Sequence, residues 1–201
     1  MKIDFDNFSH RECYQLLTGM ILPRPIAWVS TVGEDGTFNL APFSFFTGIT
    51  SKPPLICISI GPRRGEKKDT LKNIEFAGDF VINIVNESLA QKMNQTSADY
   101  PSNVSEFVET RLTPLSSDKV KSPRLAESPI NMECKLRQIL TFGEQNQGSN
   151  LIIGEVVRAH VQDALLKDAA IDAAGLGAIG RLSGNQYCHV KDIFEIKRPS
   201  L

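Results

Sequence analysis

Residues 26–60 read IAWVSTVGEDGTFNLAPFSFFTGITSKPPLICISI, and this stretch decides the fold class. β-Branched and aromatic residues gather in short runs, and turn-forming residues separate these runs at 33–36 (GEDG) and 52–54 (KPP). Such runs between Gly and Pro signals are typical of β-strands, and the GEDG turn predicts a hairpin with a four-residue loop. We therefore expect consecutive antiparallel strands at 26–32, 37–40, 43–50 and 55–60.

Further strands are expected downstream of this stretch. Residues 80–85 (FVINIV) form another apolar run, and polar and apolar side chains alternate within 130–142 and 151–161. A period of two is typical of a strand with one face in water. A polar, Gly-containing turn is expected at 143–149. Because the strands follow one another without β-α-β-α alternation, we predict a mainly β protein, a closed or partly closed antiparallel barrel of about six strands with a few short helices.

The length favours one domain, which we expect to span residues 1–201, since domains run to roughly 100–200 residues. Its core is expected at 18–88 and 130–198. The polar, Ser/Pro-rich segment at about 96–129 is expected to be an excursion from this core, with a short helix near 107–111. Other helices are predicted at 69–75, with Asp69 as N-cap, and at 87–95; a last extended piece is expected at 193–196.

The charge balance excludes several classes of partner. The chain has 22 Lys and Arg against 23 Asp and Glu, so its net charge of −1 gives no footprint for nucleic acid or an anionic membrane. No apolar run is long enough for a transmembrane helix, and the start MKIDFDNFSHRE lacks the order of a signal peptide. We therefore expect a cytoplasmic protein. Four separated cysteines predict free thiols, and three scattered histidines predict no metal site.

A Gly-rich motif and a basic loop are the two candidate phosphate sites in the sequence. Residues 175–180 match G-x-G-x-x-G, but no strand precedes them and the residues that follow break any helix, so a dinucleotide site is not expected. The loop at 61–68 carries four cations, Arg63, Arg64, Lys67 and Lys68, just before a predicted helix. Cations beside free backbone N–H groups suit a phosphate, whereas a solvated basic loop is the alternative.

The segment around Pro42 is a second candidate for ligand contact. Asn39 and Ser44 flank this proline inside an apolar strand region. Proline cannot donate to a strand ladder, so it marks a sheet edge or a bulge, where backbone groups are left free for a ligand. The alternative is an irregular strand that belongs only to the core.

Several motifs follow one another in order along the chain: LPRPIAWVST at 22–31, Gly36, NLAPFS at 39–44, Pro53-Pro54, KDTLKN at 68–73 and GRLSGNQY at 180–187. Together these motifs resemble the flavin reductase-like family, with the flavoredoxin-like proteins as the most similar branch. The resemblance covers residues 18–88 strongly and 150–198 loosely. It departs from many relatives at Ser183-Gly184, where they have Gly-Gly, and this leaves the role of that loop open.

The resemblance implies an FMN-binding, six-stranded antiparallel Greek-key split β-barrel, usually a homodimer with the flavin near the subunit interface. Lys68, Asp69 and Thr70 would lie by the phosphate. No catalytic side chain is expected, because the cofactor carries the difficult step. The implied cofactor-binding residues are Arg24, Ser30, Thr31, Asn39, Ala41, Phe43, Ser44, Ser59, Ile60, Gly61, Lys68, Asp69, Thr70 and Arg181.

The function implied is that of an oxidoreductase. NADH or NADPH would deliver hydride to bound FMN, which would pass electrons to free flavin, a partner monooxygenase or another acceptor. The alternatives are a flavoredoxin-like electron carrier without nicotinamide turnover of its own, and a split barrel that has lost flavin. The residues leave open which nicotinamide donates, which acceptor is final, and whether FMN is prosthetic or exchanged.

Overall fold

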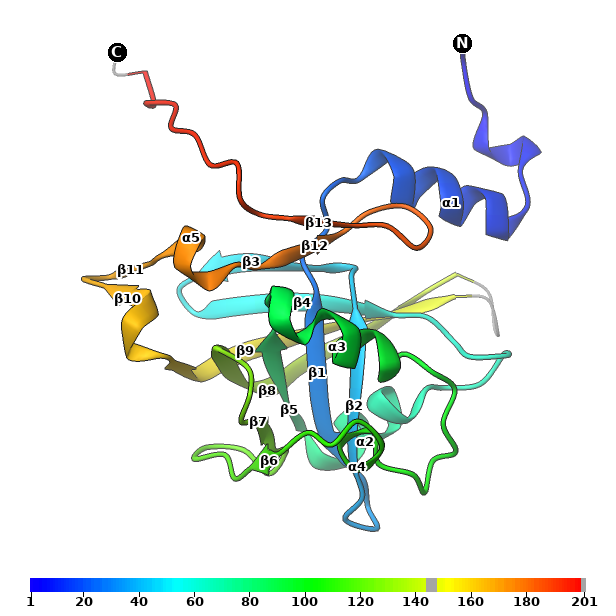
Figure 1. Ribbon diagram of the computed structural model, residues 1–201. Helices are drawn as coiled ribbons and strands as arrows, with labels where there is room; N and C mark the ends of the chain where they lie inside the picture. Colours follow the sequence, from blue (N-terminus) through cyan, green and yellow to red (C-terminus); the bar gives the residue numbers. More distant parts are fainter. Residues whose placement is uncertain (144–147, 200–201) are drawn as a thin grey trace.

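The computed structural model describes residues 1–143 and 148–199, and its centre is one antiparallel seven-stranded sheet. The strand order is β2-β1-β5-β8-β9-β4-β3 (Figure 1). The mainly β, antiparallel prediction is confirmed. All seven runs predicted from the sequence form strands, so the sheet has one strand more than the six-stranded barrel that the resemblance implied. The strands are β1 (Ala27–Val32), β2 (Phe38–Phe43), β3 (Phe46–Ser51), β4 (Pro54–Ile60), β5 (Asp79–Ile84), β8 (Ile130–Phe142) and β9 (Ser149–Val161).

The two edge strands of this sheet, β2 and β3, are consecutive in the chain. Only Ser44 and Phe45, here called the corner, separate the end of β2 from the start of β3. The Ser59 N–H at the end of β4 donates to the Phe45 carbonyl at 2.8 Å, which ties this side of the sheet to the corner. Among the described residues no ladder joins β2 to β3, so the barrel is split at this point.

Pro42 lies on edge strand β2, opposite Trp28 of β1. This agrees with the expectation that it marks a sheet edge, where its missing N–H costs no ladder hydrogen bond. The hairpin between β1 and β2 is confirmed, although its loop, 33–37, is one residue longer than expected.

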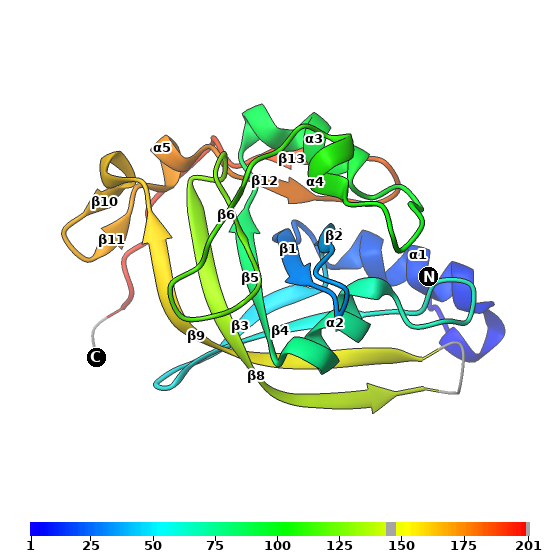
Figure 2. The same ribbon diagram turned by 90° about the horizontal axis from the view of Figure 1, so that it is seen from below.

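The long strands β8 and β9 curve around the molecule (Figure 2). Their pairing shifts register between Glu133 and Cys134 and again between Leu136 and Gln138. Such irregularities bend a strand and increase its twist, which allows a single sheet to curl into an open barrel. The turn that we predicted at 143–149 lies partly outside the described residues.

Two apolar clusters lie on the two faces of the curled sheet. The main cluster fills the barrel and includes Val29, Phe80 and Leu71 of helix α2 (Asp69–Ala77). The second cluster lies outside the barrel wall and includes Trp28 and Phe107. Successive residues of a strand point to opposite faces, so β1 contributes to both clusters and is buried on both sides.

The predicted helices are present, with one boundary corrected. The helix expected at 69–75 is α2, but Lys68 is its N-cap and Asp69 is its first residue, so the prediction of Asp69 as N-cap was wrong. The Lys68 backbone is extended, with φ −66° and ψ 151°, whereas the Asp69 carboxylate lies in the first turn, where the helix dipole favours negative charge. The shorter helices are α3 (Ala90–Gln95), α4 (Glu106–Glu109) and α5 (Ala173–Leu176), with 3-10 turns at Phe5–Asn7, Glu87–Leu89 and Asp163–Leu165.

An N-terminal helix, α1 (His10–Met20), was not predicted. Its sequence signal is a capping box, in which the Ser9 hydroxyl accepts from the Glu12 N–H while the Glu12 carboxylate accepts from the Ser9 N–H. Thr18 is its only fully buried residue, so α1 lies on the surface of the barrel. No helix in the described ranges has the length and hydropathy needed to cross a bilayer.

The segment at 96–129 packs over the outer face of the sheet through buried polar contacts. The Asn83 side chain on β5 accepts from the Leu125 N–H at 3.0 Å and donates to the Trp28 carbonyl at 2.9 Å. The Asp79 carboxylate accepts from the N–H groups of Lys121 and Ser122, both at 3.0 Å. These contacts satisfy backbone groups in a stretch that has little secondary structure.

Short two-stranded sheets complete the structure. The Gly-rich stretch at 175–180 runs from α5 into β12 (Ile179–Arg181), which pairs with β13 (Tyr187–His189). No helix follows the glycines, which agrees with the exclusion of a dinucleotide fingerprint. The other pairs are β6 (Pro114–Leu115) with β7 (Arg124–Leu125), and β10 (Leu166–Lys167) with β11 (Ala170–Ile171).

Candidate functional site

A groove of about 720 Å³ opens beside the corner. Its walls are the corner with the end of β2, the end of β4 with the basic loop that follows it, and the first turns of α1. A second cavity of about 260 Å³ adjoins it and shares Tyr14, Phe43 and Ser44 with it. The predicted site residues that line the groove are Phe43, Ser44, Ser59, Gly61 and Lys68, and Arg181 lines the adjoining cavity.

Lys68 is the half-buried cation of the groove. Its ammonium lies 5.4 Å from the centroid of the Phe43 ring. Burial lowers the pKa of Lys68 below its usual value of 10.5, with Asp99 opposing this effect and Arg63 adding to it. In the part of the chain that the structure describes, no carboxylate lies within ion-pair distance of Lys68. The groove therefore holds a partly dehydrated positive charge that an anion would stabilise.

The other cations of the basic loop have carboxylate partners. Arg63 and Arg64 both pair with Asp99, at 3.8 and 3.3 Å, and Lys67 pairs with Glu75 at 2.7 Å. Arg64 and Lys67 are largely exposed, and exposed pairs of this kind contribute little to stability. The solvated-loop interpretation thus fits part of the loop, while Lys68 faces the groove.

Three more predicted residues connect α2 to the sheet behind the groove. The Asn39 side-chain amide donates to the Thr70 hydroxyl at 3.0 Å, and the Asn73 amide donates to the Thr31 hydroxyl at 3.0 Å. Thr31 and Thr70 are buried. Asp69, the first residue of α2, lies 3.9 Å from Arg63. These contacts fix the start of α2, and therefore the position of Lys68.

The side chains of three predicted residues, Ser30, Ala41 and Ile60, are packed inside the protein, on one face of the sheet or the other. The Ser30 hydroxyl donates to the Pro123 carbonyl and accepts from the Asn83 amide at 3.0 Å, on the face covered by the excursion. Ala41 packs against the main apolar cluster, and Ile60 is part of it. In the described residues these three side chains are engaged in packing rather than on the groove wall.

Arg24 supports the groove from behind. It is 4% exposed, and its guanidinium donates to the carbonyls of Thr18 (2.5 Å), Ile21 (3.0 Å) and Leu182 (2.9 Å). Its Nε atom lies 3.4 Å from the Ser44 hydroxyl. Burial lowers the pKa of Arg24 below its usual value. Arg24 thus joins the C-terminal end of α1, the corner and the loop after β12.

Four groove residues come from α1 and its cap, and the sequence reasoning missed them: Ser9, His10, Arg11 and Tyr14. The Tyr14 ring stands 6.1 Å from the Phe45 ring, centroid to centroid, so the helix contacts the corner. The S-x-x-E capping box at Ser9–Glu12 was the signal that would have identified this helix. Its contact with the groove had no sequence signal.

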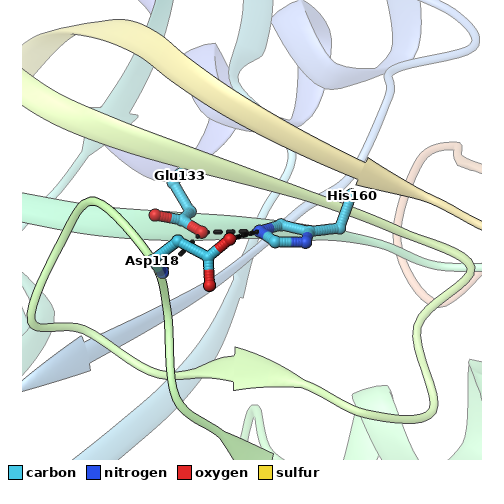
Figure 3. Close-up of side chains that lie close together, drawn as sticks. All are labelled: Asp118, Glu133 and His160. Atoms are coloured by element: carbon cyan, nitrogen blue, oxygen red, sulfur yellow. Dashed lines mark hydrogen bonds and ion pairs between the residues drawn. The ribbon is translucent and has the colours of Figure 1, made fainter.

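A second polar cluster consists of Asp118, Glu133 and His160 (Figure 3). Its ligand-type atoms all lie within 4.8 Å of one another, which is close enough to hold a metal ion. The buried Glu133 carboxylate already accepts from the N–H groups of Asp118 (3.0 Å) and Lys119 (2.6 Å) and lies 2.6 Å from His160 Nε2. Asp118 pairs with Arg158 at 2.5 Å.

These contacts connect Asp118 of the 96–129 segment to Glu133 on β8 and His160 on β9, and so hold the segment against this hairpin. The Arg158 cation and the backbone donors take up the oxygens that a metal ion would need. The groove is lined by Ser149 at the start of β9, whereas His160 lies near its end. The cluster and the groove therefore belong to opposite ends of the same strand.

The family model described as "Flavin reductase like domain" matches residues 19–175. A curated Halalkalibacterium halodurans protein, BH2278, is 39% identical to the chain over 100% of it and 98% of its own length. Nitrilotriacetate monooxygenase component B from Bacillus cereus superposes with a TM-score of 0.94, at 38% identity and with 98% of each chain covered.

A second solved structure, 2-nitrobenzoate 2-nitroreductase NbaA from Pseudomonas fluorescens, has a TM-score of 0.91 and 30% identity, covering 100% of this chain and 97% of its own. The flavoredoxin of Desulfovibrio vulgaris, at 22% identity and a TM-score of 0.76, shares the fold. The family match spans the corner, β4 and the basic loop that line the groove. The chain belongs to the flavin reductase-like family.

Proposed function

We propose that the protein is an FMN-binding oxidoreductase that accepts hydride from NADH or NADPH and passes electrons to free flavin or to a partner monooxygenase. The observation that carries this proposal is the half-buried Lys68 ammonium beside the Phe43 ring. FMN combines a flat apolar ring with a terminal phosphate. An aromatic wall next to a cation that has no carboxylate partner within residues 1–143 and 148–199 suits both parts of that molecule.

The groove fits FMN in size and in chemistry. Its volume of about 720 Å³ lies within the range of roughly 300–1,000 Å³ typical of small-molecule sites. Phe43 and Phe45 supply apolar surface, and the Ser44 and Ser59 hydroxyls supply hydrogen-bonding groups at the same wall. FMN, when bound, supplies the ring that accepts hydride.

The remaining residues bind the cofactor or hold in place the elements that surround it. Lys68 holds the phosphate, while Asp69, Thr70, Asn39 and Thr31 keep the start of α2 in place behind it. Arg24 holds α1 and the corner together, so that α1 limits the access of water to the groove. Ser30, Ala41 and Ile60 support the site through the sheet rather than by contact with the cofactor. No side chain is required to move a proton during hydride transfer.

The identity of the electron acceptor separates two candidates. The similarity to nitrilotriacetate monooxygenase component B favours transfer to free flavin or to a monooxygenase component. The similarity to 2-nitrobenzoate 2-nitroreductase favours direct reduction of a small aromatic nitro compound. Steady-state oxidation of NADH and NADPH, with free FMN or 2-nitrobenzoate as the only acceptor under anaerobic conditions, distinguishes them.

We also propose that the active form is a homodimer. Helix α1 exposes Tyr14, Leu17 and Met20, and Ile49 is exposed on edge strand β3. Edge strands and apolar faces need cover, and a two-fold dimer covers both with one interface. Light scattering should give about twice the chain mass of 22.2 kDa.

The cofactor proposal is tested by the absorbance spectrum of the purified protein, followed by anaerobic titration with NADH and NADPH. Bound oxidised flavin that bleaches with one of these donors supports an oxidoreductase. Bound flavin that neither donor bleaches would instead indicate an electron carrier without nicotinamide turnover. Protein that binds no FMN when the cofactor is added would overturn the proposal.

A further inference from the structure

The cavity of about 260 Å³ that adjoins the groove is here called the annex. It lies between the end of β2, helix α3 and the β12–β13 hairpin (Figure 2). Tyr14, Phe43 and Ser44 belong to the walls of both cavities, so a molecule bound in the annex would lie directly beside the groove. The cofactor proposed for the groove leaves the annex without an assigned ligand.

The annex is lined by a guanidinium that no carboxylate neutralises. Within residues 1–143 and 148–199, no carboxylate lies within ion-pair distance of Arg181, and no Asp or Glu lines the annex. Arg181 donates to the Tyr187 hydroxyl and to the Gly184 carbonyl, and its guanidinium carbon lies 4.5 Å from the centroid of the Tyr187 ring. These contacts hold the guanidinium in place but leave further N–H groups for a ligand.

A second guanidinium, that of Arg24, adds to the positive charge. Arg24 and Arg181 stand directly opposite each other in a short antiparallel bridge, joined by backbone hydrogen bonds of 3.0 and 2.8 Å. Like charges in directly opposite positions destabilise such a pair. Burial lowers the pKa of Arg24, and the Arg181 charge lowers it further. Since Arg24 Nε lies 3.4 Å from the Ser44 hydroxyl on the annex wall, an anion in the annex would offset both positive charges.

The rest of the annex wall suits one flat ring. Phe43 and Met93 are buried side chains of this wall, and Tyr14 and Tyr187 add aromatic surface. The Tyr187 hydroxyl, which accepts from Arg181, donates to the Asn94 side chain at 3.3 Å, so the polar end of the wall is ordered. The volume of about 260 Å³ lies below the range of roughly 300–1,000 Å³ typical of drug-sized ligands, which favours a single ring over a second flavin or a dinucleotide.

We propose that the annex binds a small aromatic carboxylic acid, with the Arg181 guanidinium on its carboxylate and the side chains of Phe43 and Tyr187 beside its ring. An arginine fork binds a carboxylate through two parallel hydrogen bonds, so Arg181 selects acids over neutral rings of the same shape. The inference rests on the proposed function in one respect: it makes the acid a second substrate, held next to the cofactor in the groove.

Benzoate and benzamide are the probes for this site, because they share a ring and differ in charge. Equilibrium dialysis of the purified protein against each labelled probe, with FMN present and with FMN absent, measures both dissociation constants. Benzoate should bind saturably and at least about tenfold more tightly than benzamide. Equal affinities, or no saturable binding of benzoate up to about 20 mM, would overturn the proposal.

Two variants place the carboxylate at Arg181. Arg181→Gln should weaken benzoate on the order of tenfold and leave benzamide nearly unchanged, whereas Arg137→Gln, which removes an exposed arginine on β8, is the charge-matched control and should change neither. Asn94→Asp keeps the oxygen that accepts from Tyr187 and adds a negative charge to the annex wall, so it should weaken benzoate alone. It decides the question if Arg181→Gln does not fold. A folded variant of either kind that binds benzoate as wild type does would overturn the assignment.

The cofactor is measured separately in the same preparations. FMN and benzoate should bind together, and benzoate should shift the visible absorbance of the bound flavin, because the two cavities share a wall. Displacement of FMN by benzoate would make the annex part of the cofactor site and would overturn the inference. Protein that binds benzoate through Arg181 but takes up no FMN would refute the proposed function alone. Flavin that NADH or NADPH bleaches, in protein that does not bind benzoate, would refute the annex assignment alone.

Discussion

The ammonium nitrogen of Lys68 lies 5.4 Å from the centroid of the Phe43 ring, at a point where two distant parts of the chain meet on the groove wall. Lys68 is the N-cap of α2, and Phe43 is the last residue of β2. Burial partly dehydrates the Lys68 ammonium and so lowers its pKa. The ammonium lies close to the N-terminus of α2. A phosphate placed here would gain a charge-assisted hydrogen bond without any need to rearrange the wall.

Replacing Lys68 should therefore discriminate between two forms of flavin. Lys68→Ala should weaken FMN by about 1.5–3 kcal/mol, roughly tenfold to over a hundredfold, and leave riboflavin nearly unaffected, because only FMN carries the phosphate. Fluorescence titration of the apoprotein with each flavin measures this. Lys67→Ala, which removes an exposed cation paired with Glu75, is the matched control. Equal weakening of both flavins by Lys68→Ala would mean that this loop does not hold the phosphate.

Lys68 and Phe43 were expected at the site because their motifs, the loop-to-helix start and the Pro-containing strand, resemble those of the family, and such motifs are local in the sequence. It could not predict α1 as a groove wall. The contact of Tyr14 with Phe45 joins segments about 30 residues apart, and no local pattern encodes it. The strands themselves were predictable, because burial of β-branched runs between turns depends on neighbouring residues alone.

Two adjacent strand residues, Ser30 and Thr31, show what could not be predicted from the sequence. Ser30 and Thr31 were both expected at the cofactor, yet adjacent strand residues point to opposite faces. Which face carries a site depends on what covers the other one. Here the excursion covers the outer face and takes up the Ser30 hydroxyl through Pro123. A polar, Ser/Pro-rich segment gives no sign of where it will dock, so this outcome required the structure.

The contacts of Arg24 predict that the attachment of α1 to the barrel contributes to the free energy of unfolding. Arg24→Met removes the donors to three carbonyls, those of Thr18, Ile21 and Leu182, and should cost about 3 kcal/mol in the free energy of unfolding. Urea unfolding measures the loss, and hydrogen exchange should show faster exchange of α1 amides.

Arg137→Met is the matched control for this experiment. Arg137 is 58% exposed and pairs with Glu155, so its loss should cost less than about 1 kcal/mol. Arg24→Lys should recover part of the stability, because an ammonium reaches fewer of the carbonyls. A loss no larger than that of the control would show that Arg24 does not hold α1.

The lowered pKa of Glu133 predicts that the folded protein loses stability in acid. Burial alone would raise its pKa, but hydrogen bonds from the Asp118 N–H, His160 and the Lys119 N–H outweigh it, so the pKa is lowered from its usual 4.5. A carboxyl with a lower pKa in the folded state contributes stability above its unfolded pKa. That contribution is lost as the pH falls below about 4.5 and through the folded value.

The wild-type free energy of unfolding should therefore fall between pH 6 and pH 3, and Glu133→Gln should be less stable at pH 6 but lose less on acidification. Urea titrations at several pH values measure both slopes. Glu34→Gln, in the exposed β1–β2 loop, is the control and should keep the wild-type slope. A Glu133→Gln protein with the full wild-type acid slope would assign the acid sensitivity to other carboxyls.

Hydride transfer should not depend on any histidine. His160 forms a hydrogen bond with Glu133 near the end of β9, and His189 lies 3.5 Å from Glu87 on the surface. Of the three histidines, only His10 lines the groove. In the proposed function the cofactor performs the chemical step, so the chain would need only to align two rings and to hold the phosphate. Replacing His10, His160 or His189 with Ala should leave the anaerobic single-turnover rate of flavin bleaching within about threefold of wild type.

Changes that shift the cofactor should act differently. Asn39→Ala removes the hydrogen bond to Thr70 that steadies α2, and Ser44→Ala removes a hydroxyl from the corner. Both should lower the bleaching rate on the order of tenfold with FMN still bound, because a small misplacement of reacting rings is costly. The decisive comparison is His10→Ala against Ser44→Ala, since both residues line the groove. A hundredfold loss confined to His10→Ala, at saturating FMN and nicotinamide, would contradict this account and would demand a proton-transfer role for that imidazole.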